Sequence, residues 1–129
     1  MIGYITLGSN DLPRARAFYS DLVGVIGGKK LMEFGEDFTM YGVDMGAPGI
    51  AITKPFNGET ATAGNGNMAA IVVNQRALVD ALHAKALALG GTCEGPPGLR
   101  GDEGPSAFYG AYFRDLDGNK LCAFRMGPA

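Results

Sequence analysis

Few side chains in the chain of 129 residues are of the types that do nucleophilic, acid–base or metal chemistry. There is one histidine, His83, and the two cysteines, Cys93 and Cys122, fall in no Cys-x-x-Cys or Cys/His cluster. We expect both cysteines to be reduced thiols. Cys122 as a nucleophile would need a base or a positive neighbour, and no histidine is near it in sequence, so an inert thiol is the favoured interpretation. His83 lies in a predicted helix beside the apolar stripe, and we predict it to be a surface residue that points away from any cleft.

Two further charged groups are candidates for chemistry. The acidic residues Glu36 and Asp37 fall in a predicted turn, and adjacent carboxylates there are more typical of a solvated turn than of an acid–base pair. Arg100, in the loop PPGLRGDEGP, is the best candidate for a charge that faces a ligand, because long loops beside a sheet often carry recognition. The alternative for Arg100 is a solvated arginine that pairs with Asp102 or Glu103.

The composition is that of an ordinary globular domain. Hydrophobic residues make up 47% and charged residues 19%, and the net charge of −2 comes with scattered basic residues. This balance argues against nucleic acid or an anionic membrane as a partner. No apolar run approaches the roughly 20 residues of a membrane span, and no secretory leader is apparent, so we expect a cytoplasmic protein.

The elements that must position these residues follow a regular order. Hydrophobic periodicity predicts a strand, a helix that ends near Leu22 and three strands, at 2–8, 11–22, 29–34, 38–44 and 50–54. A glycine- and threonine-rich stretch at about 55–66 is typical of an exposed linker. The same order then returns, with Asn74 as the expected N-cap of the second helix, at 67–73, 75–89, 92–95, 107–114 and 120–126.

The two halves have matching spacing. The distance along the chain from Tyr4 to the Gly27-Gly28 pair agrees within about one residue with that from Met68 to the Gly90-Gly91 pair. We therefore predict one α+β domain over 1–129, built from two βαβββ modules at about 1–54 and about 67–129. The alternative is an unduplicated α+β sandwich in which the spacing is coincidental.

Three segments carry a resemblance to a known family. They are YITLGSNDLPRARAFYSDLVG, AIVVNQRALVDALHAKALALGGTCEGPPG and YGAYFRDLDGNKLCAF, in which Leu116 replaces a usual proline. The chain resembles the glyoxalase/bleomycin-resistance/extradiol-dioxygenase (vicinal oxygen chelate) superfamily. The resemblance implies two βαβββ modules whose curled mixed sheets form a cleft, usually within a homodimer, with His, Gln or Glu ligands around a metal ion. It says far less about chemistry, because this fold serves many functions.

The positions at which the family holds its metal are occupied by other residue types. They fall on Tyr4, Met68 and Cys122, and among residues 50–53, none of which offers imidazole or carboxylate. A hard divalent cation prefers such donors, so the resemblance and the residues together predict a lost metal site and no cofactor.

The period-2 pattern of each strand separates a helix-facing side from a cleft-facing side. We predict that a ligand is bound by residues on the cleft side and by the loop arginine, namely Tyr4, Thr6, Met68, Ala70, Arg100, Phe108, Tyr112, Cys122 and Phe124. Tyr4 is the candidate for a hydrogen bond to a ligand oxygen. The alternative is a closed cleft in which these side chains are buried packing.

Three functions remain open at this point. The favoured one is a metal-free homodimer that binds a small hydrophobic or aromatic molecule, for resistance, sequestration or sensing. The second is a glyoxalase-like lyase or a dioxygenase-type oxidoreductase with an atypical site, which would lack the Lewis acid. The third is a structural or regulatory partner whose cleft is vestigial.

Overall fold

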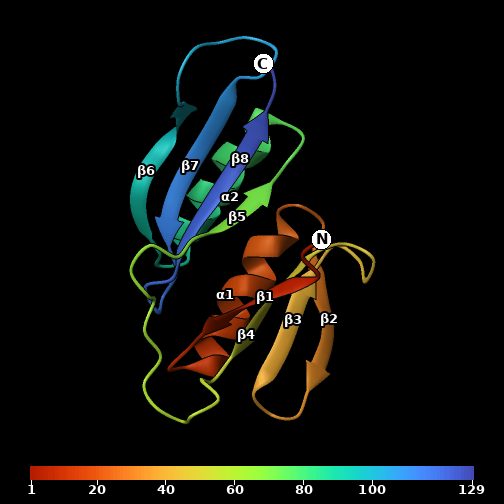
Figure 1. Cartoon of the computed structure of the whole chain (residues 1–129), viewed down its shortest axis with the longest axis vertical. Coiled ribbons are helices and arrows are strands. Elements are labelled where there is room, and N and C mark those ends of the chain that lie inside the picture. The colour runs from red at the N-terminus through yellow and green to blue at the C-terminus, as the bar shows by residue number, and fades with distance from the viewer.

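The structure, a computed structural model, describes residues 1–129 as two helices and eight strands (Figure 1). The first half contains β1 (Tyr4–Gly8), α1 (Leu12–Gly24), β2 (Lys29–Phe34), β3 (Phe38–Gly42) and β4 (Gly49–Thr53). The second half contains β5 (Ala69–Val72), α2 (Arg76–Ala88), β6 (Thr92–Leu99), β7 (Phe108–Arg114) and β8 (Lys120–Met126). None of the helices is long and apolar enough to cross a membrane.

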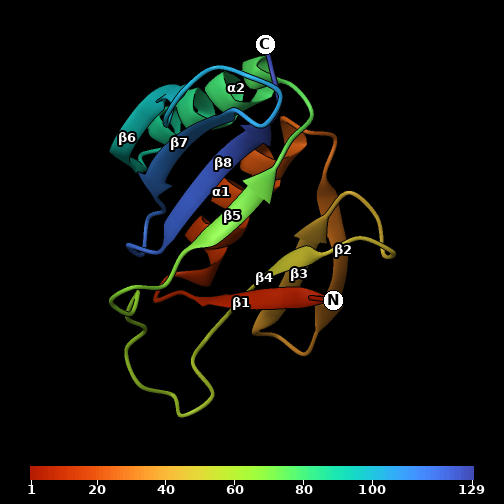
Figure 2. The same ribbon diagram turned by 45° about the horizontal axis from the view of Figure 1, so that its top comes forward.

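The two halves have the same topology. Sheet A has the strand order β1-β4-β3-β2 and sheet B the order β5-β8-β7-β6. In each sheet the first strand pairs in parallel with the last strand of its half, and the other pairs are antiparallel. The predicted α+β fold of two βαβββ units is therefore confirmed, and Figure 2 shows the two mixed sheets at an angle to each other.

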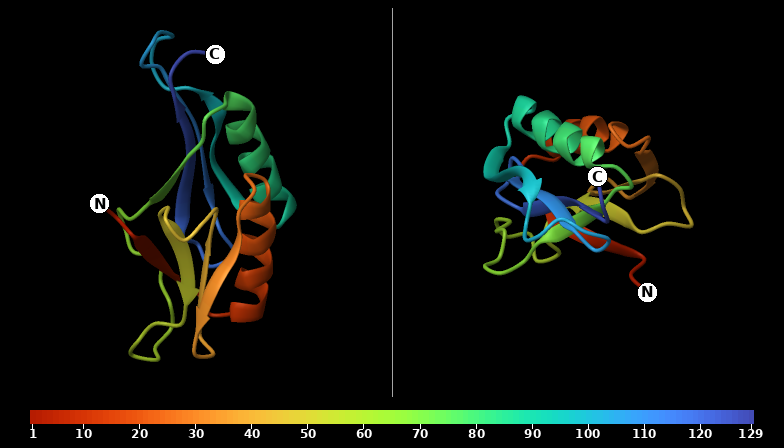
Figure 3. Two further views of the ribbon diagram at one scale, coloured as in Figure 1. Left: turned by 90° about the vertical axis from the view of Figure 1, so that its right-hand side faces the viewer. Right: turned by 90° about the horizontal axis from the view of Figure 1, so that it is seen from above.

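The helices lie on the same side of the molecule, each against its own sheet (Figure 3). A single core of 17 buried residues runs through both halves, so the modules share one hydrophobic interior. Ala111, Phe113, Leu121 and Ala123 point into it, as the period-2 pattern predicts, which leaves the alternate residues of β7 and β8 on the face away from α2. That uncovered side of sheet B is called the open face below.

The two helix starts differ in their caps. The Asp11 carboxylate accepts a hydrogen bond from the Arg14 amide at 3.2 Å, so this side chain caps α1 and stabilises it. The prediction of Asn74 as the cap of α2 is wrong, because Gln75 occupies that position and makes no side-chain cap bond. Local composition favours Asn as a cap, but the backbone path from β5 sets which residue is there.

The prediction that His83 is a surface residue is also wrong. Its side chain points away from the open face, but it is only 6% exposed. The reason is that Cys93 of β6 and Phe113 of β7 pack against this flank of α2. The strand β6 also runs to Leu99, beyond the predicted end at residue 95. The segment at 55–66 is largely exposed, as expected, although Ala61 is buried and both its amide and its carbonyl bond to the Asn10 side chain.

Candidate functional site

The structure divides the nine predicted ligand-binding residues into three groups. Most of them lie together on or beside the open face of sheet B, namely Ala70, Arg100, Phe108, Tyr112, Cys122 and Phe124. Thr6 and Met68 instead line a separate cleft between the modules. Tyr4 lies on sheet A, where its ring meets the Phe38 ring edge-on at 5.8 Å between centroids. The sequence pattern therefore located the faces, but not one shared pocket.

The open face of sheet B carries an aromatic platform. The rings of Phe108 and Phe124 stack with their centroids 5.2 Å apart and their planes 6° apart. Gly110 lies between them in the strand pairing, and a Cβ there would come within 2.6 Å of the Phe108 ring. The glycine therefore leaves room for the edge of the Phe108 ring. Beside the platform, Val72 is 67% exposed.

Two cations flank the ring of Tyr112. The Arg100 guanidinium lies 5.4 Å and the Lys120 ammonium 5.6 Å from its centroid, within the range of cation–π attraction. Arg100 donates hydrogen bonds to the carbonyls of Pro96 (2.6 Å) and Gly98 (3.0 Å), which fix its direction. It pairs with neither acidic residue of its loop, so the predicted alternative, an ion pair with Asp102 or Glu103, is wrong.

The backbone of β6 makes room for this arginine. A Cβ at Gly95 would lie 3.3 Å from Nη2 of Arg100 and 3.0 Å from the Tyr112 ring. Any larger residue at position 95 would push the guanidinium away from Tyr112. The glycines of this strand thus hold the arginine side chain close to the sheet.

Cys122 lies under this cluster and is 1% exposed. Burial raises the pKa of the Cys122 thiol, and the nearby Arg100, Tyr112 and Lys120 only partly oppose that effect. A raised pKa keeps the sulfur protonated and weakly nucleophilic. The geometry agrees with an inert thiol that contributes to the floor of the site.

The intermodule cleft has a volume of about 480 Å³ and lies where β1 meets the start of β5 and β8. Thr6, Met68, Asn119 and Lys120 contribute to its walls. Its position is fixed by Asn119, whose amide donates to the Gly8 carbonyl (3.0 Å) and to the Asp115 carboxylate (2.9 Å). Lys120 belongs to both this cleft and the open-face cluster, so the two regions adjoin.

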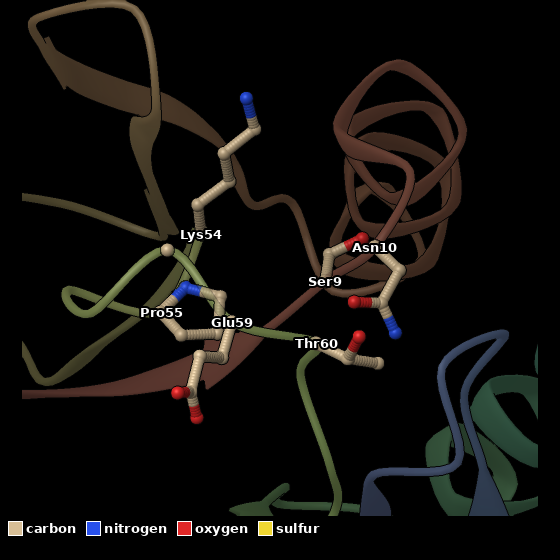
Figure 4. A pocket seen from close by; sticks show the side chains of 7 residues that line it. Ser9, Asn10, Lys54, Pro55, Glu59 and Thr60 are labelled. Carbon is tan, nitrogen blue, oxygen red and sulfur yellow. The ribbon is translucent and has the colours of Figure 1, made fainter.

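A smaller polar pocket of about 200 Å³ lies on the first module (Figure 4). It is formed where β1 turns into α1 and by the following linker, with Ser9, Asn10, Lys54 and Glu59 among its residues. The Lys54 and Glu59 side chains extend in different directions in Figure 4. Since no set of donors converges there, this pocket is a weaker candidate than the open face.

The donor set does not suit the metal ion that the fold family implies. The positions in question carry a phenol (Tyr4), a thioether (Met68) and a thiol of raised pKa (Cys122), with Ile50 to Thr53 on β4. No group of three or more His, Cys, Asp and Glu side chains is placed to hold a metal ion. A hard divalent cation would find no carboxylate or imidazole at these positions.

Comparison with known proteins agrees with the topology. The model of the Glyoxalase/Bleomycin resistance protein/Dioxygenase superfamily matches residues 1–123. The chain belongs to this superfamily. No curated protein is significantly similar to it in sequence.

Solved structures of the superfamily show the same fold. A glyoxalase/bleomycin resistance protein from Albidiferax ferrireducens is 38% identical, with a TM-score of 0.86, over 97% of this chain and 98% of that one. A glyoxalase/bleomycin resistance protein/dioxygenase family enzyme from Burkholderia phytofirmans is 21% identical, with a TM-score of 0.71, over 96% and 97%. Lactoylglutathione lyase from Agrobacterium tumefaciens is 19% identical, with a TM-score of 0.65, over 97% and 92%. The last two similarities concern the fold alone.

Two residues of the site were missed in the sequence. Val72 and Lys120 have the same strand parity as Ala70 and Cys122, so the period-2 pattern already placed them on this face. The cation–π contact of Arg100 had no sequence signal, because it depends on how the chain bends back over β6.

Proposed function

We propose that this protein binds a small organic acid with an aromatic or apolar body, without a metal ion, and acts by sequestration or sensing. The observation that carries the proposal is the open face of sheet B, where a stacked aromatic pair adjoins a tyrosine with a cation on each side. Binding of this kind requires affinity alone, so it does not need the Lewis acid that a lyase or dioxygenase of this fold would use.

The apolar part of the ligand is matched by the aromatic platform. The Phe108 and Phe124 rings are half-buried and leave apolar ring surface exposed beside Val72. Stacking of a further ring or an aliphatic group on such a surface is favourable by about 0.5–1.5 kcal/mol beyond the area it buries.

The acidic group of the ligand is matched by two cations, Arg100 and Lys120, that have no carboxylate partner in the protein. Neither Arg100 nor Lys120 lies within ion-pair distance of a carboxylate, whereas the neighbouring Arg114 is paired with Glu94 at 2.8 Å. The Arg100 guanidinium has five N–H groups and its two bonds to carbonyls leave others free for a carboxylate.

We further propose that two copies associate through the open face of sheet B and the exposed apolar side chains of sheet A. Large apolar side chains are exposed on both sheets, with Tyr4 55%, Val72 67% and Phe34 76% exposed. Exposed apolar residues gathered in this way are typical of an interface. A second copy over sheet B would enclose the ligand and exclude water from its charged group. Light scattering after size-exclusion chromatography tests this part independently of ligand binding.

The test of the function is calorimetric titration and thermal shift of metal-analysed protein with benzoate-type acids and their uncharged amides. We expect the acids to raise the melting temperature and the amides to bind at least about tenfold more weakly. Arg100→Ala and Lys120→Ala should each weaken acid binding, and Lys54→Ala, which removes an exposed lysine of the first module, should not.

Equal binding of acids and amides would refute the role of the two cations. Stoichiometric nickel, zinc, manganese or iron in the purified protein would refute the metal-free part and favour a lyase or dioxygenase-type enzyme.

A further inference from the structure

A second group of reactive side chains lies on the opposite face of sheet B, between β6 and α2. The Nε2 atom of His83 is 3.2 Å from the Sγ atom of Cys93. These are the only histidine and the only exposed cysteine of the chain. The site is separated from the aromatic platform by the thickness of the sheet, so its chemistry is independent of the function proposed above.

The two side chains differ in their access to solvent. Cys93 pairs with Phe113 in the register of β6 and β7, so its side chain is on the helix side, but β6 is the edge strand and the residue is exposed. His83 is buried on the flank of α2, with its ring 6.4 Å from that of Phe113 at 72°. Burial and the edge of the Phe113 ring limit the rotation of His83, and its Nε2 is directed at the sulfur.

Burial keeps the imidazole of His83 in its neutral form, which is the form a general base must have before it accepts a proton. Burial lowers the pKa of His83, and the Asp80 carboxylate, one turn earlier on α2, only partly opposes this. The ring is therefore neutral near pH 7, with a nitrogen lone pair available to the thiol. When the proton has been transferred, the charge of Asp80 stabilises the imidazolium.

We propose that Cys93 is a modification site that reacts with low-molecular-weight disulfides, with His83 as its general base. The Cys93 proton passes to Nε2 of His83 and the sulfur attacks one sulfur of the disulfide. An S–S bond forms at Cys93 while the S–S bond of the reagent breaks. The departing thiolate takes the proton from His83, so Cys93 is oxidised to a mixed disulfide and half of the reagent is reduced to a thiol.

Cys122 serves as the internal control. It is buried and its pKa is raised, so the same reagent should reach it only after unfolding. A mixed disulfide at Cys93 would also place its added group against α2 at the edge of the sheet, away from Phe108 and Phe124.

The experiment treats the folded full-length protein with hydroxyethyl disulfide and follows adduct formation at each cysteine by peptide mass spectrometry. We expect Cys93 to react about tenfold or more faster than the same cysteine in a peptide of residues 90–96, and Cys122 not to react. His83→Gln should bring the rate at Cys93 down to that of the peptide, while Lys85→Gln, an exposed change on the same helix, should leave it unchanged.

Circular dichroism establishes that each variant is folded, and the comparison of the unaltered protein with the peptide does not depend on any variant. A rate at Cys93 equal to that of the peptide, or a His83→Gln variant that reacts as fast as the unaltered protein, would overturn the proposal.

Discussion

In each module one turn joins the third and fourth strands. The two turns occupy the same place in the repeat but differ in their hydrogen-bond partners. The turn at 115–119 is drawn into the interior, with Asp115 only 7% exposed. Its carboxylate accepts four hydrogen bonds, from the Tyr19 hydroxyl at 2.6 Å, the Asn119 side-chain amide, and the backbone amides of Asp117 and Asn119, each at 2.9 Å. Tyr19 belongs to the first module, so this turn joins the two halves.

The corresponding turn at 43–48 is exposed and binds only itself. The Asp44 carboxylate accepts one bond from the Gly46 amide at 2.6 Å, and Ala47 donates to the Asp44 carbonyl at 3.3 Å. The turn at 115–119 therefore links the two modules, whereas the turn at 43–48 only reverses the direction of the chain. Since the intermodule cleft lies beside Asn119, the bound turn also sets the shape of that cleft.

Among the substitutions that test the difference between the two turns, Asp115→Ala should have the largest effect. Removing the carboxylate leaves the Tyr19 hydroxyl and the Asn119 backbone amide without an acceptor, and the Asn119 side-chain amide keeps only its bond to the Gly8 carbonyl. Each buried group left without an acceptor costs about 1–3 kcal/mol. We expect the free energy of unfolding to fall by about 3 kcal/mol or more, measured by urea denaturation. A loss below about 1 kcal/mol would show that the turn does not hold the modules together.

Tyr19→Phe removes one bond of the network and keeps the ring in the core. It leaves Asp115 with its three other donors, so we expect a loss of about 1–2 kcal/mol by the same measurement. Tyr41→Phe is the matched control, because its hydroxyl bonds only to the Arg16 carbonyl at 3.2 Å within the first module. The contrast between the turns would fail if both variants lost the same amount.

The pH dependence of stability should distinguish the unaltered protein from Tyr19→Phe. Burial and, next, the charge of Asp115 raise the pKa of Tyr19 well above its usual value. A group whose folded pKa is raised contributes stability below its unfolded pKa, about 10 for tyrosine, and loses it as pH rises beyond that. Unfolding measured from pH 9 upward should therefore show a steeper loss for the unaltered protein than for Tyr19→Phe. An equal loss of stability with pH in the two proteins would contradict the raised pKa of Tyr19.

Asn10→Ala tests the hydrogen bonds that attach the linker at 55–66 to the chain beside the turn at 115–119. The Asn10 side chain accepts a hydrogen bond from the Ala61 amide (2.8 Å) and donates one to the Ala61 carbonyl (3.1 Å), and the substitution removes both. The backbone amide of Asn10, which the substitution keeps, donates to the Asp117 carboxylate at 2.9 Å. We expect a loss of about 1 kcal/mol and faster proteolysis within 55–66. Asn57→Ala, which loses only bonds to Glu59 in the same segment, should be cleaved no faster than the unaltered protein.

The smallest effect is expected at the free turn. Asp44→Ala removes one solvent-exposed bond, so the free energy of unfolding should change by less than about 0.5 kcal/mol. Thermal and urea denaturation of Asp44→Ala, measured in parallel with Asp115→Ala, checks this expectation. A loss at Asp44 as large as at Asp115 would mean that the two turns are equivalent after all.

Local sequence determined the repeated elements and their faces. The spacing of apolar residues in each half predicted both helices, and strand parity placed Ala111 and Phe113 in the core and Tyr112 and Cys122 on the other side. Such features depend on chain periodicity alone, so they are readable before any tertiary contact is known.

Only the tertiary structure decided which of these features meet. Burial of His83 depends on the packing of α2 against β6 and β7, and its contact with Cys93 follows from that packing. The bond from Tyr19 to Asp115 joins residues 96 apart in the chain, and the Arg100 contact depends on the path of the backbone over glycines. Long-range contacts arise from the packing of whole elements, and no local pattern of residues encodes their pairing.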